Sequence, residues 1–200
     1  ATNSPFEQLA KSMALPPSRF PKNTAPISDP SHPAITVQLD ACIDCTLCVR
    51  ACRDVQVNDV IGLAYRGNQQ KVSFDFDDLM AESTCVACGE CVQACPTNAL
   101  SNNLNKPSTI DKSVQTVCPY CGVGCQLNLD IKDNKIVNVN GADGPSNEGR
   151  LCVKGRYGFD YINSSQRLTE PLIRKPGVPK GINIDPANPY SHFRCASWQE

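Results

Sequence analysis

Twelve of the thirteen cysteines lie in three runs whose spacing is typical of iron–sulfur ligands. Three thiolates in the pattern C-x2-C-x2-C can hold a [4Fe–4S] cubane, and a fourth cysteine three residues further on crosses to a second cubane in two-cluster proteins. CIDCTLCVRAC and CVACGECVQAC both have this pattern. The spacing therefore predicts two cubanes, with the ligand sets Cys42, Cys45, Cys48 and Cys95, and Cys85, Cys88, Cys91 and Cys52.

The third run, CPYCGVGC, is followed by a single distant cysteine. A C-x2-C-x3-C run completed in this way can close on one cubane of its own. The predicted ligands of this third cubane are Cys118, Cys121, Cys125 and Cys152. Three cubanes in one chain would form a path for single electrons. Cys195 has no partner cysteine and is interpreted as a free thiol.

Zinc and disulfides are the alternative uses of these thiols. Zinc ligands usually come as C-x2-C pairs that are a dozen or more residues apart, which is a poor match to three thiols within seven residues. A disulfide scaffold suits a short secreted chain, whereas this one has 200 residues, an odd thiol count and no apolar export segment. Iron–sulfur binding is favoured, and thiolates kept for metal indicate a reducing compartment, the cytoplasm.

Composition limits the other function classes. The chain has 16 prolines, 12 glycines and a net charge of −1, with both signs interspersed. We expect small cores, no nucleic-acid surface and no membrane span, because there is no basic stripe and no long apolar run. The partners should be proteins or cofactors. The chain begins without Met and stops in what reads as the first turn of a helix, so we expect it to be cut at both ends.

The pattern along the chain favours an α+β fold. Residues 1–37 contain seven prolines and no cysteine, which predicts a linker or wrapping arm with a short helix around Phe6 to Met13. Residues 38–104 form the two-cluster unit, and 105–115 a polar connector. Alternating apolar residues predict hairpins at 60–76 and 126–140. Each cysteine run should be a loop that leads into a short helix, which supplies backbone N–H groups to the sulfurs.

Several segments of the sequence together resemble a known family. CPYCGVGC, GPSNEGRLCVKGRYGFDYI, SQRLTEPLIRK and FRCASWQE resemble the start of the catalytic subunit of molybdenum or tungsten bis-pterin oxidoreductases. Within that superfamily the chain is most similar to the large subunit of NAD-dependent cytoplasmic formate dehydrogenase. The preceding two cysteine runs resemble the two-cluster domain that such subunits carry before the molybdenum domain. The resemblance covers roughly residues 29–200.

The resemblance implies a two-cluster ferredoxin-like domain followed by a small β-rich [4Fe–4S] subdomain at 116–174, with the start of a pterin-binding domain at 175–200. It also implies oxidation of formate to carbon dioxide at molybdenum or tungsten held by two pterin guanine dinucleotides. Electrons would leave through the cubanes towards flavin/NAD-binding and other iron–sulfur subunits. The metal ligand and the formate-binding residues of the family lie downstream, so no catalytic residue is expected in this segment.

Lys154 matches the family's lysine between the third cubane and a pterin. An ammonium two residues from Cys152 could donate hydrogen bonds to the pterin edge and ease the arrival of an electron; a surface lysine is the alternative. Arg150 and Arg156 are weaker candidates for the same neighbourhood. His32 and His192 match no family motif and are interpreted as solvated loop histidines.

Two other functions remain open. The chain could be the iron–sulfur subunit of a respiratory NADH dehydrogenase or of a hydrogenase, which shares this cluster arrangement. It could also be a stand-alone ferredoxin-like electron carrier without a catalytic domain. A molybdenum-ligating cysteine or selenocysteine downstream would belong only to the formate dehydrogenase, because function resides in the site and not in the fold.

Overall fold

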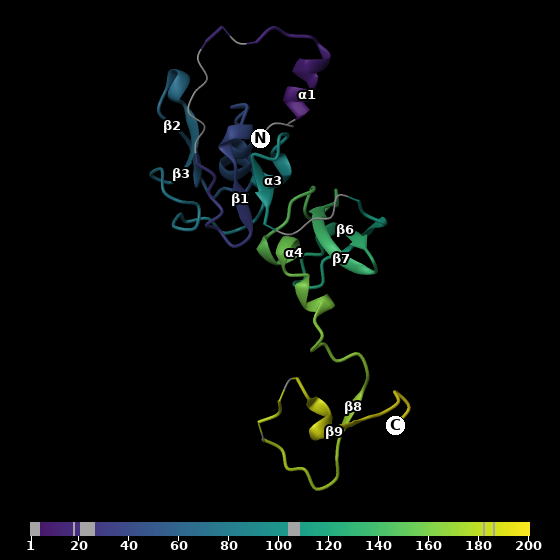
Figure 1. Cartoon of the computed structure of the whole chain (residues 1–200). Coiled ribbons are helices and arrows are strands. Elements are labelled where there is room, and N and C mark those ends of the chain that lie inside the picture. Colours follow the sequence, from purple (N-terminus) through teal and green to yellow (C-terminus); the bar gives the residue numbers. More distant parts are fainter. Residues whose placement is uncertain (1–4, 18, 21–26, 104–108, 182, 186) are drawn as a thin grey trace. The chain divides into compact units, whose positions relative to one another are not determined.

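The computed structural model describes residues 5–17, 19–20, 27–103, 109–181, 183–185 and 187–200. The chain divides into two compact units, Ala1–Phe159 and Asp160–Glu200 (Figure 1). Parts of two expected segments, the arm at 1–37 and the connector at 105–115, lie outside the described residues. The content of helix and strand is mixed, as predicted.

Short elements follow one another along the chain. The α-helices are α1 (Pro5–Ser12), α2 (Leu47–Arg50), α3 (Glu90–Ala94) and α4 (Val153–Tyr157), and the π-helix η2 (Ala51–Val55) continues α2. The strands are β1 (Ile35–Val37), β2 (Ile61–Ala64), β3 (Lys71–Phe74), β4 (Leu100–Asn102), β5 (Lys112–Val117), β6 (Gln126–Lys132), β7 (Lys135–Gly141), β8 (Leu172–Arg174) and β9 (Phe193–Cys195). The 3-10 helices are η1 (Leu39–Ala41), η3 (Gly67–Gln69), η4 (Asp160–Asn163) and η5 (Pro189–Ser191).

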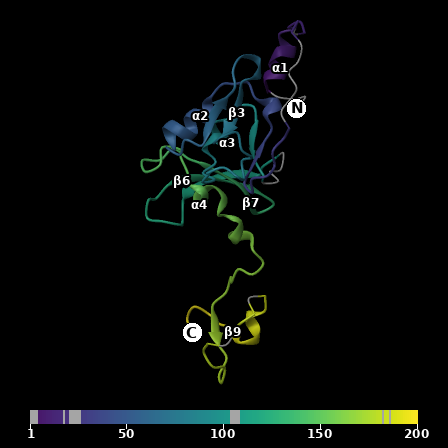
Figure 2. The same ribbon diagram turned by 90° about the vertical axis from the view of Figure 1, so that its left-hand side faces the viewer.

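The first core lies between two short helices, each of which lies within a cysteine run, and two small antiparallel pairs of strands. α2 and α3 are in contact (Figure 2), β1 pairs with β4, and β2 pairs with β3. The β2–β3 pair confirms the hairpin predicted at 60–76, with η3 at its turn. The buried cluster consists of Ile35, Val37, Cys48, Val49, Cys52, Val60, Ile61, Val72, Phe74, Met80, Cys91 and Leu100. Three of the predicted ligands thus belong to the core itself.

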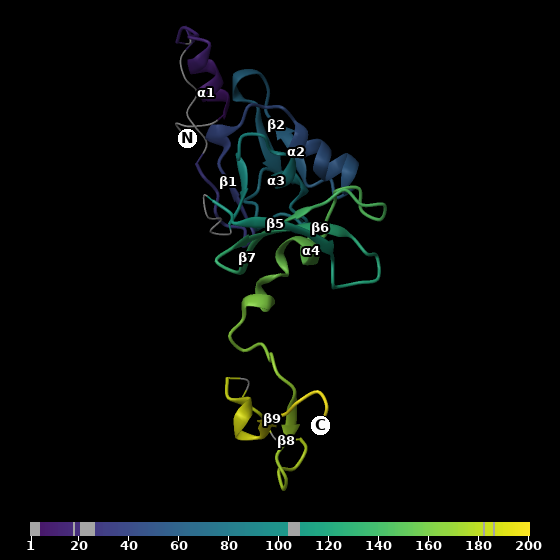
Figure 3. The same ribbon diagram turned by 90° about the vertical axis from the view of Figure 1, so that its right-hand side faces the viewer.

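A second core lies under the three-stranded sheet β5–β6–β7, against which α4 packs (Figure 3). The β6–β7 pair, joined at Asp133 and Asn134, confirms the hairpin predicted at 126–140. Leu127, Val139 and Leu151 are buried here together with Cys118. The sheet begins inside the segment expected to be a connector, because β5 starts at Lys112.

Two sequence-based expectations about local structure are wrong. The third cysteine run leads into β6 and not into a helix, since the Cys118 amide donates to the Cys125 carbonyl (2.8 Å) and closes the run as a loop between strands. The short helix of this region, α4, follows Cys152 instead. His32 lies in a loop shortly before β1 but is buried; its Nδ1 accepts from the Ala34 amide at 3.2 Å, and burial lowers its pKa.

The second unit, Asp160–Glu200, contains η4, the antiparallel pair β8–β9 and η5. Cys195 ends β9 and is exposed. Among the described residues of the chain, no helix has the length and apolar character that a membrane crossing requires.

Candidate iron–sulfur sites

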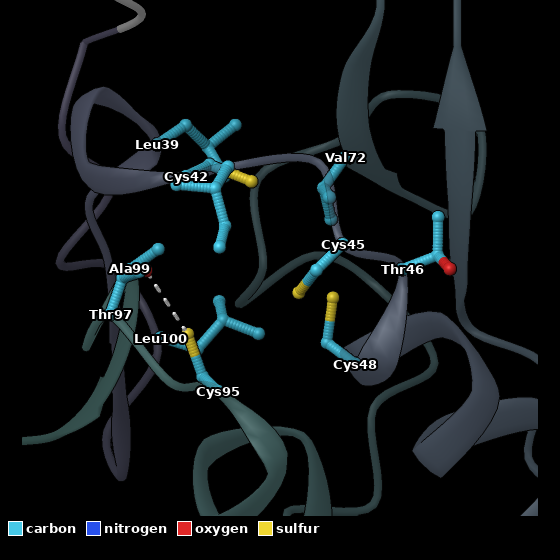
Figure 4. Close-up of a pocket in the computed structure, with 11 residues that line it drawn as sticks. Leu39, Cys42, Cys45, Thr46, Cys48, Val72, Cys95, Thr97, Ala99 and Leu100 are labelled. Atoms are coloured by element: carbon cyan, nitrogen blue, oxygen red, sulfur yellow. Dashed lines mark hydrogen bonds between the residues drawn. The ribbon is translucent and has the colours of Figure 1, made fainter. Parts of the chain in front are cut away.

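The first predicted ligand set surrounds one cavity. Cys42, Cys45, Cys48 and Cys95 line a common hollow whose other walls include Leu39, Val72 and Leu100. In Figure 4 the four sulfur-bearing side chains face this common space. Cys42 and Cys45 come from the loop that leads into α2, and Cys48 lies on α2 itself. Cys95 comes from the other run, directly after α3.

The second predicted set surrounds another hollow, which is lined by Cys52, Cys85, Cys88 and Cys91. Cys52 lies on η2, which continues the helix after the first run, and the other three belong to the second run. The contact between α2 and α3 therefore carries one cysteine from each run into the other run's group. This is the arrangement that crossed ligation requires.

The two loops direct backbone amides at sulfur in the same way. The Asp44 amide lies 3.4 Å from Cys42 Sγ, and the Ala87 amide lies 3.4 Å from Cys85 Sγ. Both donors have a left-handed backbone, with φ of 53° and 55°. Such conformations are uncommon outside glycine and turn the N–H inwards. Amides aimed at sulfur would stabilise the negative charge of a bound cluster.

Burial affects the thiols of both groups. It raises the pKa of Cys48 to about 11 and that of Cys91 well above its ordinary value, and the negative charges of neighbouring thiolates add to both shifts. Four ionised thiolates around one apolar hollow would repel one another unless a cation lay between them. The irons of a cubane would supply that charge, so the residues present fit a [4Fe–4S] cluster.

The third predicted set also comes together, nearer the surface. Cys118, Cys121, Cys125 and Cys152 are close enough for their charges to interact: burial raises the pKa of Cys125, and the other three raise it further. Cys118 is buried, whereas Cys121 and Cys152 are exposed. An open hollow beside Cys125 and Cys152 is lined mainly by the segment 145–151.

Asn147 holds the bend that returns Cys152 to the other three cysteines. Its buried side chain donates to the carbonyls of Gln126, Ala142 and Arg150 at 2.9 to 3.1 Å. Its Oδ1 accepts from the Gln126 amide at 2.9 Å. One side chain thus ties the start of β6 to both sides of the bend.

The three basic candidates near Cys152 lie in different settings. Lys154 is exposed on α4. Arg150 is partly exposed and forms an ion pair with Glu148 at 3.2 Å. Arg156 is buried, and its guanidinium points back into the two-cluster region, where it meets Glu90. The sequence reasoning missed Glu90 entirely. Its only local signal is a carboxylate between Gly89 and Cys91, in a run that is otherwise apolar or small.

Two parts of the chain match family models of iron–sulfur domains. Residues 41–99 match the 4Fe-4S dicluster domain, and residues 111–164 match the molybdopterin oxidoreductase Fe4S4 domain. The resemblance inferred from the sequence is thereby confirmed. These two regions are similar to iron–sulfur domains, and the second is of the kind found in molybdopterin oxidoreductases.

Curated relatives with similar sequences carry more specific names than the two domain families. "Probable oxidoreductase YjgC" of Bacillus subtilis (strain 168) is 32% identical over 86% of this chain and 20% of its own length. A "Putative formate dehydrogenase" of Staphylococcus haemolyticus is 32% identical over 82% of this chain and 21% of its own length. Another of that name, from Staphylococcus aureus (strain USA300), is 34% identical over 73% and 19%. The chain spans about a fifth of the length of these relatives.

Among solved structures, a crystal structure of an NAD+-reducing [NiFe]-hydrogenase in the H2-reduced state is similar to part of the chain. Its sequence identity is 23% and its TM-score 0.45, over 55% of this chain and 47% of that one.

Proposed function

We propose that the chain carries three [4Fe–4S] clusters and conducts electrons within the catalytic subunit of a formate dehydrogenase. Residues 38–104 would form a two-cluster ferredoxin-like domain with crossed ligation, and 116–174 the small β-rich subdomain that holds the third cluster. Residues 175–200 would begin the pterin-binding domain. The gathering of the three cysteine sets is the observation that supports this proposal most strongly.

The protein's part in this function is to hold, insulate and space the clusters. Apolar walls such as Leu39, Val72 and Leu100 exclude water from the first site, which strengthens the interaction of the sulfurs with the amides aimed at them. The third site leaves Cys121 and Cys152 exposed. Further chain or a cofactor could cover them, as expected of the cluster that receives electrons first.

The complete protein would also hold molybdenum or tungsten in a bis(pterin guanine dinucleotide), which supplies the two-electron oxidation of formate to carbon dioxide. Lys154 is our candidate for the contact between this cofactor and the third cluster, because it is exposed on the helix that begins after Cys152. Electrons would leave towards flavin/NAD-binding and other iron–sulfur subunits. All thirteen cysteines are free of disulfides, which is compatible with the reducing cytoplasm.

Reduction of the clusters by formate in the complete protein tests this function. The anaerobic protein, oxidised and loaded with iron and molybdenum or tungsten, would be mixed in turn with formate, hydrogen and NADH while cluster absorbance and EPR signals are followed. Formate alone should reduce the clusters without any partner subunit. Reduction by hydrogen, or by no donor except dithionite, would instead indicate a hydrogenase subunit or a stand-alone carrier.

A further inference from the structure

A buried ion pair joins the second cysteine group to the third. Glu90 and Arg156 form it, and their residues are only 6% and 2% exposed. Arg156 Nε also donates to the carbonyl of Cys88 at 2.7 Å, and its Nη1 donates to Gln93 Oε1 at 2.9 Å. Each of the three guanidinium nitrogens of Arg156, which lies on α4, thus has a partner on the loop and helix that carry Cys88 and Cys91.

The carboxylate of this pair reaches the third group by a second bond. Glu90 Oε1 accepts from the backbone amide of Leu151 at 3.0 Å. Glu90 precedes Cys91, and Leu151 precedes Cys152. One side chain and one hydrogen bond therefore connect the residues next to a predicted ligand of each cluster.

Two glutamines reinforce the same junction. Gln93 donates to the Gly149 carbonyl at 3.2 Å and accepts from the Gly141 amide at 3.3 Å. Gln56, just beyond η2, donates to the Leu151 carbonyl at 3.3 Å. The two-cluster region therefore holds the segment that carries Cys152 through both backbone carbonyls and backbone amides.

The first cysteine run shows that a helix of this kind does not need a carboxylate. Thr46 and Gly89 occupy equivalent positions, each with a left-handed backbone immediately before its helix. The next residue is Leu47 in the first run, 40% exposed, and Glu90 in the second, buried. The carboxylate thus occurs in the run that faces the third group. A buried ion pair is also a poor source of stability, since apolar residues of similar volume often serve as well.

We propose that Glu90 and Arg156 are positioning residues that fix the spacing of the second and third clusters and form the hydrogen-bonded path for the electron between them. This inference rests on the electron-transfer function proposed above. If a cubane occupies each of these sites, one electron would pass from the third, oxidised from the 1+ to the 2+ state, to the second, reduced from 2+ to 1+. No bond is made or broken and no proton moves.

The test uses the complete, cluster-loaded protein and the double variant Glu90→Leu/Arg156→Met. Removing both charges together avoids a buried unpaired charge, so the variant should fold and keep its iron. Two conservative single variants, Glu90→Gln and Arg156→Lys, retain an oxygen for the Leu151 amide or a positive charge. The matched control is the exposed pair Lys132–Asp111 (2.8 Å), which lies on the three-stranded sheet where β6 ends and β5 begins. It is changed to Lys132→Met/Asp111→Asn.

Two measurements distinguish an electron-transfer path through the Glu90–Arg156 pair from a purely structural role of that pair. The first is the magnetic interaction between the reduced second and third clusters, read from EPR line splitting and spin relaxation. The second is the rate of electron transfer between them after one-electron photoreduction by an external dye, which requires no formate. We expect the double variant to retain full iron and sulfide, to show a weakened magnetic interaction and to transfer electrons about tenfold or more slowly. Glu90→Gln should recover part of the rate, and the control should match the wild type.

A double variant with intact clusters and wild-type rate and magnetic interaction would overturn the inference. So would a loss confined to thermal stability, with both readouts unchanged in Glu90→Gln and Arg156→Lys. Because dye photoreduction bypasses formate, a protein that fails to oxidise formate but shows the predicted slowing would contradict only the proposed function.

Discussion

Arg156 crosses directly over Gly89. A methyl group built on Gly89 would overlap Cδ of Arg156 and come within 2.7 Å of the Tyr157 hydroxyl oxygen. Gly89 also has a φ of +74°, which side chains rarely adopt. The glycine of the second cysteine run is therefore required by a side chain that lies 67 residues further along the sequence, as well as by its own turn.

Gly89→Ala should destabilise the first unit and displace Arg156. A left-handed alanine costs about 1–2 kcal/mol, and the overlap with Arg156 adds a similar amount, for a total of about 3 kcal/mol. Gly67→Ala is the matched control, because Gly67 has a φ of +64° and nothing within 4 Å of an added methyl. Denaturant unfolding of both cluster-loaded variants would measure the difference. Equal losses would show that the contact with Arg156 contributes nothing.

Crossed ligation predicts that each fourth cysteine serves the other run's cluster. Cys52→Ser should damage the cluster of Cys85, Cys88 and Cys91, and Cys95→Ser that of Cys42, Cys45 and Cys48. EPR spectra of the reduced variants would show which signal is lost. Damage to the cluster of the variant's own run would contradict the arrangement. Cys195→Ser is the control and should leave every signal intact.

Asn147→Ala should release the bend that brings Cys152 to the third site. The change removes a donor from three carbonyls, of which that of Gln126 keeps the Ala142 amide, and an acceptor from the Gln126 amide; a buried unsatisfied group costs about 1–3 kcal/mol. The third cluster's signal should be lost first, with those of the other two retained. Asn147→Asp keeps the oxygen that accepts from Gln126 and should be less severe. Equal occupancy of all sites in Asn147→Ala would contradict this role.

The cysteine spacing predicted which thiols come together, because short intervals between ligands fix their geometry locally. The hairpins were also predictable, since alternation and turn residues are local signals. The Glu90–Arg156 pair was not, because its partners are distant in sequence; Glu90 reads as an ordinary surface charge, and Arg156 was considered only for the neighbourhood of the third cubane and the pterin. The helix predicted after the third cysteine run was wrong for a related reason. β6, which follows this run, pairs with β5 and β7, so the run forms a loop between strands. Nonlocal strand pairing overrides a local preference for helix. His32 was expected to be solvated, but its burial depends on the fold around β1.

Lys154→Ala in the complete enzyme should leave iron and cofactor content near normal and slow electron exit. The exposed ammonium, if it joins the cofactor to the third cluster, is lost while every redox centre remains. Lys154→Arg should restore the rate only partly, because a planar fork replaces a compact charge. Stopped-flow would compare reduction of the clusters by formate with reduction of the molybdenum or tungsten. Unchanged cluster reduction in the alanine variant would make Lys154 an ordinary surface lysine.

Iron and acid-labile sulfide in the anaerobically reconstituted protein, measured together with zinc, test the central claim most directly. Three cubanes at four irons and four sulfides each give about 12 of both per chain. Removing the metal with a chelator should also loosen the first core, since Cys48, Cys52 and Cys91 are part of it. A preparation with two or three zinc ions per chain and no sulfide would contradict the account.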